Sequence, residues 1–100
     1  MIGIIWADLG SFERKQAEEQ LEKICKDYEK WGISCVRANN LFAAFENGDS
    51  WSIVRTPQQT RGRRCNVSYI HKYISQDTIK NFIIPYTSLP PYHAFYVYGG

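Results

Sequence analysis

The spacing of hydrophobic residues changes several times along the chain, and each spacing predicts a different element. Residues 2–7 form a continuous apolar run, which is typical of a strand covered on both faces of a sheet. Residues 11–31 instead repeat apolar side chains every three or four positions, which predicts a long amphipathic helix. The residues of its apolar face are Ala17, Leu21, Ile24, Tyr28 and Trp31. Gly32 stands where a left-handed cap would end this helix.

Short β-prone runs follow the helix. Residues 33–37 predict a second strand, which completes a strand-helix-strand unit with an expected right-handed crossover. Residues 41–45 and 50–54 flank Asn47-Gly48, a pair that favours a two-residue type I′ hairpin turn. Such a turn sets Glu46 opposite Asp49 and brings four hydrophobic residues to one face of the hairpin: Phe42, Ala44, Trp51 and Ile53.

The second half of the chain predicts a loop, a strand, a short helix and a last strand. Residues 56–64 are polar and contain Pro57 and Gly62, which favour a loop. A strand is expected at 65–70 and an edge strand at 94–98. Between them, Ser75 or Gln76 is expected to cap a short helix that stops at Pro85.

Together these elements predict an α/β fold in a single domain of residues 1–100. The expected architecture is a small mixed sheet with one long helix (about 11–31), one β-hairpin (about 41–54) and one short C-terminal helix (about 76–84). The hydrophobic content of 44% suits one core. The sequence contains no apolar run of about 18 residues and no leader pattern, so we expect no membrane span and a cytoplasmic location.

The three cysteines, Cys25, Cys35 and Cys65, are an odd number without C-x-x-C spacing. This pattern argues against a disulfide framework and against a structural zinc site, so we expect reduced cysteines in the core. The two histidines, His71 and His93, do not have metal-ligand spacing either. We therefore expect neither a metal nor a cofactor.

Charge is divided unevenly between the halves of the chain. Residues 1–50 hold six Lys or Arg against nine Asp or Glu, a net charge of −3, and residues 51–100 hold six against one, a net charge of +5. Such an asymmetry indicates a polyanionic partner, namely nucleic acid, or an acidic protein surface.

Five of the six basic residues of the second half gather around the predicted loop, and no acidic residue lies between the first and the last of these five. They are Arg55, Arg61, Arg63, Arg64 and Lys72. Guanidinium groups pair bidentately with phosphate or carboxylate, and Gly62 allows close approach of the backbone. The set is therefore a candidate site for phosphate or for a protein partner, with a merely solvated basic loop as the alternative.

Aromatic residues near this loop and near the C-terminus are candidates for base stacking or for a protein interface. They are Trp51, Tyr69, Tyr73, Tyr92, Tyr96 and Tyr98. Core packing is the favoured role of Trp51, since it alternates with Ile53 along one strand. The C-terminal rings suit either a partner surface, including a homo-oligomer, or a half-exposed edge strand.

The sequence argues against catalysis. Nucleotide hydrolases of this class need a glycine-rich loop ending in Gly-Lys, and the chain contains no Gly-Lys pair. Six residues along one strand would separate Cys65 from His71 by roughly 20 Å, which is too far for a nucleophile and its base. A pair of Cys35 and His93 stays open, although an inert thiol is favoured there.

The stretch FENGDSWSIVRTPQQTRGRRCNVSYI, Phe45 to Ile70, resembles a segment of bacteriophage terminase large subunits and related helicase-like P-loop proteins. In those proteins a hairpin leads through an arginine- and glycine-containing loop into the Walker B strand, which ends in Asp or Asp-Glu. Here His71 and Lys72 follow the strand. The resemblance therefore implies a P-loop-like half domain of phage character without ATPase activity.

The function predicted from the sequence is binding without turnover. We expect a small phage-derived protein in the cytoplasm of a bacterial host, whose basic loop contacts nucleic acid, a nucleotide phosphate or an acidic protein surface. One alternative is a phage-encoded inhibitor of a host defence system, of the anti-CRISPR kind, which would bind a host protein. Another is a degenerate P-loop ATPase fragment whose partner supplies the missing loop.

Overall fold

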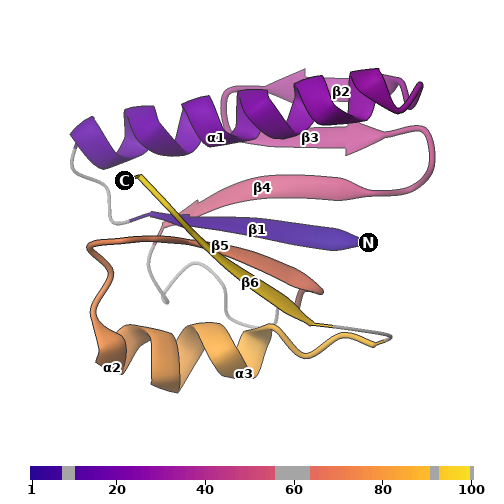
Figure 1. Cartoon of the computed structure of the whole chain (residues 1–100). Helices are drawn as coiled ribbons and strands as arrows, with labels where there is room; N and C mark the ends of the chain where they lie inside the picture. Colours follow the sequence, from indigo (N-terminus) through magenta and orange to yellow (C-terminus); the bar gives the residue numbers. More distant parts are fainter. Residues whose placement is uncertain (8–10, 56–63, 91–92, 100) are drawn as a thin grey trace.

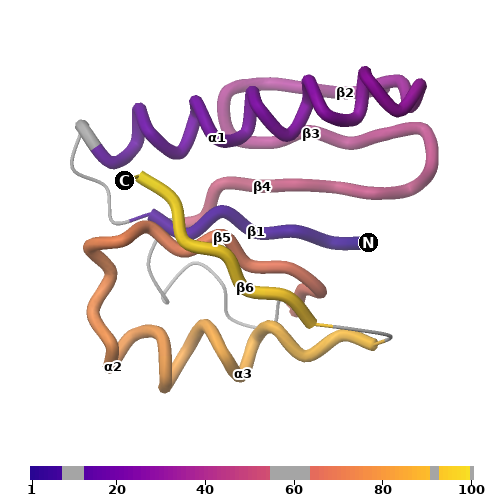
Figure 2. The backbone as a smooth tube through the Cα atoms, in the orientation of Figure 1, coloured from indigo at the N-terminus to yellow at the C-terminus, as the bar shows by residue number. Residues whose placement is uncertain are grey.

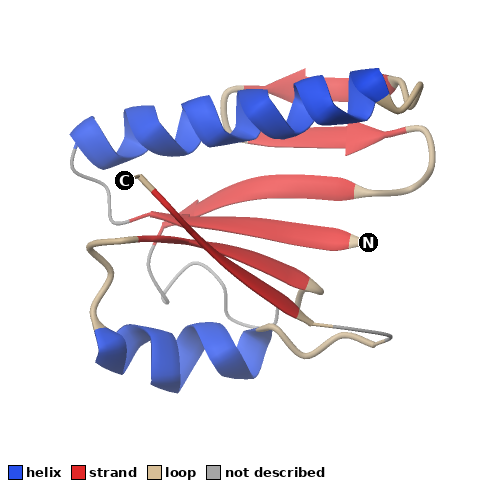
Figure 3. Ribbon diagram, in the orientation of Figure 1, coloured by secondary structure: helices blue, strands red, loops and turns tan. Residues whose placement is uncertain are grey.

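A computed structural model describes residues 1–7, 11–55, 64–90 and 93–99 of the chain. One six-stranded sheet forms its centre, in the order β2-β3-β4-β1-β5-β6, and helices pack on both of its faces (Figures 1 and 3). The predicted mixed α/β class is confirmed. The elements are β1 (Ile2–Ala7), α1 (Ser11–Lys30), β2 (Cys35–Asn39), β3 (Phe42–Phe45), β4 (Ser50–Arg55), β5 (Val67–His71), α2 (Gln76–Thr78), η2 (Ile79–Ile83), α3 (Ile84–Tyr86) and β6 (Ala94–Tyr98).

Strand β1 lies in the middle of the sheet and pairs in parallel with both of its neighbours, β4 and β5. Strand β6 continues the parallel part beside β5, whereas β2, β3 and β4 pair antiparallel. Because β1, β4, β5 and β6 run in the same direction, their carboxyl ends lie along one side of the sheet and their amino ends along the opposite side. We name these two sides the carboxyl edge and the amino edge. The central position explains the apolar run of β1, since Ile4, Ile5 and Trp6 are fully buried.

Helix α1 packs on one face of the sheet, which we name the α1 face. Its apolar side chains meet Ile5, Ala7 and Trp51 in one hydrophobic cluster. The helix ends as predicted: Gly32 has φ +74°, the Gly32 N–H donates to the Glu29 carbonyl and the Ile33 N–H donates to the Tyr28 carbonyl. The prediction was wrong for Trp31, which follows the last helical residue and is 66% exposed.

The other face of the sheet is covered by the continuous helical segment of α2, η2 and α3, and we name it the C-terminal-helix face. Ile4 and Trp6 of β1 meet Ile74 and Ile83 there in a second cluster. Ser75 caps α2 as predicted, because its hydroxyl accepts a hydrogen bond from the Thr78 N–H at 3.2 Å. The predicted stop at Pro85 was wrong, since α3 continues to Tyr86. The turn before it is a π-helix, in which the Ile84 N–H donates to the Ile79 carbonyl.

The β3–β4 hairpin forms where predicted, but its register is shifted by one residue. Ala43 pairs with Trp51 and Phe42 pairs with Ser52, so Phe42 does not share a face with Trp51. The Gly48 N–H donates to the Phe45 carbonyl, and Gly48 has φ +92°. This geometry belongs to a three-residue turn with glycine in the left-handed position, and not to a two-residue type I′ turn.

Strands β2 and β5 begin two residues later than predicted, whereas β1 and β6 have their predicted bounds. Strand β2 occupies the sheet edge at Cys35–Asn39, where Cys35 is exposed and not in the core as predicted. The structure records Cys25, Cys35 and Cys65 as free thiols. In the described part of the chain, no helix has the length and apolar character needed to cross a membrane.

Candidate functional site

The carboxyl edge between β1 and β5 is the candidate site that the topology indicates. From β1 the chain crosses the α1 face, re-enters the sheet as β2 and reaches β4 through β3, whereas from β5 it crosses the C-terminal-helix face and returns as β6. The connection that follows β1 leads toward β4, and the connection that follows β5 leads toward β6, so the two diverge from the space between β1 and β5. Open α/β sheets bind ligands at such a point, outside the carboxyl ends of the strands.

His71 ends β5 at this edge and is fully buried. Its Nδ1 accepts a hydrogen bond from the Tyr73 N–H at 3.2 Å, which leaves Nε2 to donate to Gln16 Oε1 at 2.6 Å. Any Cβ at Gly99 would lie 2.6 Å from the same Nε2, so the end of the chain closes over the ring. His71 therefore joins β5, α1 and the segment after β6, with both ring nitrogens occupied. The sequence carries no signal for its partner Gln16, which is 55 residues away.

Tyr98 is the second polar side chain buried at this edge. Its hydroxyl donates to the Trp6 carbonyl at 2.8 Å, and burial raises the pKa of Tyr98 well above its usual range, with a smaller effect from the Glu13 carboxylate. Glu13 lies in the first turn of α1, and its buried Oε2 has no hydrogen-bond partner within the described residues.

The structure separates the basic residues that the sequence grouped together. The backbone of Arg55 ends β4 beside Ala7, and Lys72 follows β5, so both stand at the carboxyl edge. Arg64 is exposed and precedes β5, so it stands on the amino side of that strand, which is itself about 13 Å long. The Arg55 side chain, Arg61 and Arg63 lie outside the described residues.

The aromatic candidates divide between the core and the surface. Trp51 and Tyr98 are buried, which agrees with core packing of Trp51 and removes both rings from a stacking surface. Tyr69 is half-buried and stacks on the exposed Tyr96, with ring centroids 5.0 Å apart. Tyr73 is exposed, and the Lys72 Nζ lies 4.9 Å from its ring centroid. Tyr92 lies outside the described residues.

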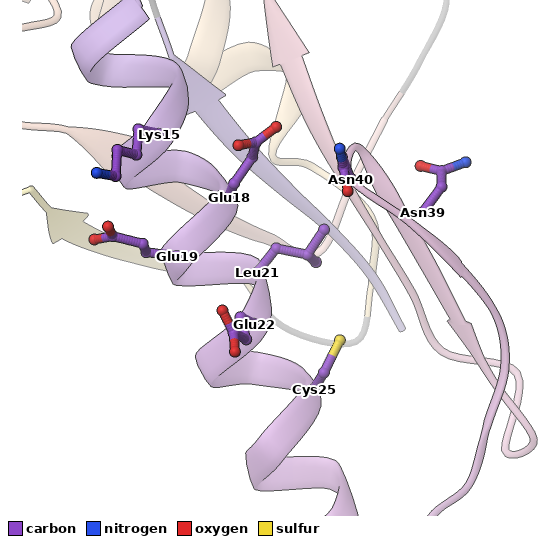
Figure 4. Close-up of a pocket in the computed structure, with 8 residues that line it drawn as sticks. All are labelled: Lys15, Glu18, Glu19, Leu21, Glu22, Cys25, Asn39 and Asn40. Atoms are coloured by element: carbon purple, nitrogen blue, oxygen red, sulfur yellow. The ribbon is translucent and has the colours of Figure 1, made fainter.

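A groove of about 480 Å³ separates α1 from the turn between β2 and β3 (Figure 4). Three glutamates and one lysine line it, so its charge does not suit a polyanion. Cys25 lies at its floor, where burial, followed by Cys35 and Glu22, raises the pKa of the thiol and keeps it protonated. The lining residues are Lys15, Glu18, Glu19, Leu21, Glu22, Cys25, Asn39 and Asn40.

The described residues bring together no three His, Cys, Asp or Glu side chains that could hold a metal ion. The open pairing of Cys35 with His93 was wrong, because β2 and β6 form opposite edges of the sheet. Comparison with known family models, curated proteins and solved structures finds no match.

Proposed function

We propose that the protein binds the phosphate groups of a nucleic acid at the carboxyl edge of its parallel strands, without turnover. The observation that supports this function best is the placement of Arg55 and Lys72 at the ends of β4 and β5, on either side of β1. Two cations on the strands that flank a topological switch point can contact a single backbone of phosphates.

The neighbouring elements favour an anion at the same place. The amino end of the 20-residue helix α1 follows β1 at this edge, and the positive end of a helix dipole attracts negative charge. In the sequence, Arg61 and Arg63 follow Arg55, and no acidic residue lies between Arg55 and Lys72. Glu13 is the described acid closest in sequence to this helix end, so a phosphate has to bind on the β4 side of Tyr98, away from that carboxylate.

Binding without turnover is favoured by the role of His71. In the terminase-like segment that the sequence resembles, an acid follows the corresponding strand, and the resemblance itself stays a prediction. Here the ring at that position is buried, and its nitrogens bond to Gln16 of α1 and to the Tyr73 N–H. A phage origin and a cytoplasmic location in a bacterial host belong to the same proposal.

Fluorescence anisotropy with single- and double-stranded DNA at several salt concentrations tests the proposal. The wild-type protein is expected to bind with an affinity that falls with salt, and each lost phosphate contact reduces the slope of log K against log salt by about 0.9 on duplex DNA. Two double variants should each reduce this salt slope: Arg55→Ala with Lys72→Ala, and Arg61→Ala with Arg63→Ala.

Two matched variants separate the carboxyl edge from a general effect of charge. Arg64→Ala removes a cation on the amino side of β5, and Arg37→Ala removes one from the outer strand β2. Both should leave the salt slope unchanged. Binding that is independent of salt, or an equal reduction of the salt slope in all four variants, would reject the proposed site.

A protein partner is the second candidate, and the edge strand β6 favours it. Strand β6 contains no charged residue, no proline and no bulge, and Val97 is 72% exposed. The opposite edge, β2, carries Arg37 and a register shift between Cys35 and Arg37, two devices that protect an edge strand. An uncharged edge is suited to accept an extended strand of another protein.

Capture of a stoichiometric partner from bacterial lysate tests this candidate, which includes an inhibitor of a host defence system. Val97→Lys should abolish capture, because it places a charge on the free edge. Val36→Lys on β2, at a position 65% exposed, is the matched control and should retain the partner. Retention of the partner by Val97→Lys would exclude β6 as the contact.

A further inference from the structure

A pocket opens at the amino edge of the sheet, between the last turns of α1 and strands β5 and β6. Strand β6, at the edge of the sheet beside β5, is inclined to α1, so its carboxyl end approaches the start of α1 while its amino end diverges from the helix (Figures 1 and 2). The narrow end is closed by a hydrogen bond in which Gln16 Nε2 donates to the Gly99 carbonyl at 3.2 Å. At the wide end the helix leaves part of β5 and β6 uncovered.

Aromatic rings line this pocket, which has a volume of about 170 Å³. Its floor is buried and includes Tyr28 and Trp51, whereas Trp31 and Tyr96 at the rim are exposed. Tyr69, half-buried, lies between the floor and the rim. The remaining lining residues are Met1, Ile24, Asp27 and Val67.

The rings meet at steep angles, as the walls of a box do. Tyr28 and Trp31 are inclined by 58° with centroids 5.4 Å apart, and Trp51 meets Tyr69 at 66° and 5.5 Å. Tyr96 stacks on one face of Tyr69. A cation is attracted to the face of a ring within about 6 Å of its centroid, so a single charge in such a box can contact several rings.

The electrostatics of the pocket favour a positive ligand. Asp27 is exposed, and its carboxylate has no ion pair or hydrogen bond within the described residues. Burial, then Tyr96, then the Asp27 carboxylate raise the pKa of Tyr69, which places the negative charge near the pocket. Asp27, Tyr28 and Trp31 also surround the end of α1, where the helix dipole is negative.

One cation already lies at the pocket, the α-ammonium of Met1. It donates to Asp49 Oδ1 at 2.8 Å, and Asp49 Oδ2 accepts from the Tyr28 hydroxyl at 2.6 Å. The charge of this ammonium is therefore balanced by Asp49. The Asp27 carboxylate remains to balance the charge of a ligand.

We infer that this aromatic pocket binds an organic cation of the quaternary ammonium class, either a small molecule or the methylated side chain of a peptide. The volume is similar to that of a cavity that holds benzene, about 150 Å³, and is smaller than the roughly 300 Å³ at which drug-sized ligand pockets begin. A trimethylammonium group fits this size, whereas a nucleotide does not. An anion is disfavoured by Asp27, and this pocket lies at the opposite edge from the proposed phosphate site.

Titration of the wild-type protein with choline and with its uncharged isostere 3,3-dimethylbutan-1-ol tests the charge requirement directly. The two ligands have the same shape, and only choline makes cation–π contacts. We expect saturable quenching of tryptophan fluorescence by choline and by tetramethylammonium, and binding of the alcohol weaker by about three- to thirtyfold. Equal binding of choline and the alcohol, or no saturable change with either cation, overturns the inference.

Two substitutions at the exposed rim locate the site without disturbing the core. Trp31→Leu should weaken choline binding by about three- to thirtyfold, and Asp27→Asn by about fivefold. Tyr73→Leu and Glu29→Gln are the matched controls, since both residues are exposed outside the pocket. Because Trp31→Leu removes a fluorophore, the variants are compared by calorimetry. Unchanged affinity in both rim variants rejects this location.

A second set of three ligands decides the source of the cation. A short peptide with trimethyl-lysine is compared with the same peptide carrying unmodified lysine, and with free trimethyl-lysine. Tighter binding of the methylated peptide than of the free amino acid supports a protein-borne ligand. Equal binding of those two supports a small molecule. Preference for the unmodified lysine peptide contradicts the aromatic pocket.

Discussion

The two faces of the sheet are built differently. On the C-terminal-helix face, aliphatic side chains such as Ile74 and Ile83 cover β1, and the few polar groups bond to one another, as Ser68 does with Thr87 at 2.7 Å and with Trp6 Nε1 at 2.9 Å. On the α1 face, the core includes four aromatic residues, Tyr28, Phe45, Trp51 and Tyr98, and the helix leaves β5 and β6 partly uncovered. One face therefore closes the core, whereas the other combines core packing with an accessible pocket.

This difference locates stability and binding on separate side chains. Substitutions on the C-terminal-helix face should change the free energy of unfolding, whereas rim residues of the α1 face should change ligand binding at nearly constant stability. Substitutions in the polar network of Tyr28, Asp49 and Trp51 should have an intermediate effect on the free energy of unfolding. In this network the Trp51 Nε1–H donates to the Tyr28 hydroxyl at 3.1 Å. The predictions below test the comparison, beginning with the largest expected effect.

Ile83→Ala should destabilise the protein by about 2–5 kcal/mol, because it leaves a cavity under the C-terminal helix at a residue with 0% exposure. Urea unfolding followed by circular dichroism measures the change. Ile84→Ala, one residue later and 50% exposed, is the matched control and should change stability by less than about 0.5 kcal/mol. Equal effects of the two variants would show that this face is not closed as described.

Gly3→Ala should destabilise the α1 face by about 1–3 kcal/mol. A Cβ at position 3 would fall within the Trp51 indole, which lies directly against this part of β1. Since Trp51 is fixed by its hydrogen bond to Tyr28, the ring cannot move away without losing that bond. Thermal unfolding measures the loss, and a wild-type melting temperature for Gly3→Ala would contradict the close packing.

Asp49→Asn should cost about 1 kcal/mol at pH 7. Burial alone would raise the pKa of Asp49, but hydrogen bonds from the Met1 ammonium, Tyr28 and Asn47 outweigh it and hold the pKa below its ordinary value. The folded-state pKa thus lies below the unfolded value of about 3.9, so the stabilisation is present above that pH and is lost as the pH falls through the folded pKa. Urea unfolding across this range should show the wild-type and Asp49→Asn stabilities converging in acid.

Trp31→Leu should change the free energy of unfolding by less than about 0.5 kcal/mol, the smallest effect in the series. The side chain is exposed and follows the last residue of α1. The same variant is expected to lose choline affinity, so stability and binding are measured on one protein sample. A large loss of stability would show that the α1 face depends on its rim as the other face depends on Ile83.

Local signals in the sequence predicted the elements well. The helix at 11–30 and its end at Gly32 follow from side-chain spacing and from one glycine with a left-handed conformation. The hairpin was also predicted, but its register was not, because Asn47-Gly48 suits both a two-residue and a three-residue turn. The turn before Pro85 is closed by a hydrogen bond from the Ile84 N–H to the Ile79 carbonyl. This bond needs no N–H from Pro85, so the proline does not end the helix.

The candidate sites depended on information that local patterns do not contain. Five basic residues close in sequence suggested one cluster, but β5 carries the chain from the amino edge to the carboxyl edge between Arg64 and Lys72. The aromatic pocket gathers residues from α1, β4, β5 and β6, and no spacing connects the residues of the helix with those of the strands. Sheet order brings such residues together, and strand pairing over long separations cannot be read from periodicity.

The central place of β1 has a consequence for the nascent chain. The most apolar strand is synthesised before both of its neighbours, which begin only at Ser50 and Val67. Until both have left the ribosome, Ile4, Ile5 and Trp6 have no sheet to enter, and contacts of such long sequence separation form slowly. A newly made first half therefore exposes an aggregation-prone strand, and chaperone contact at this stage would protect it.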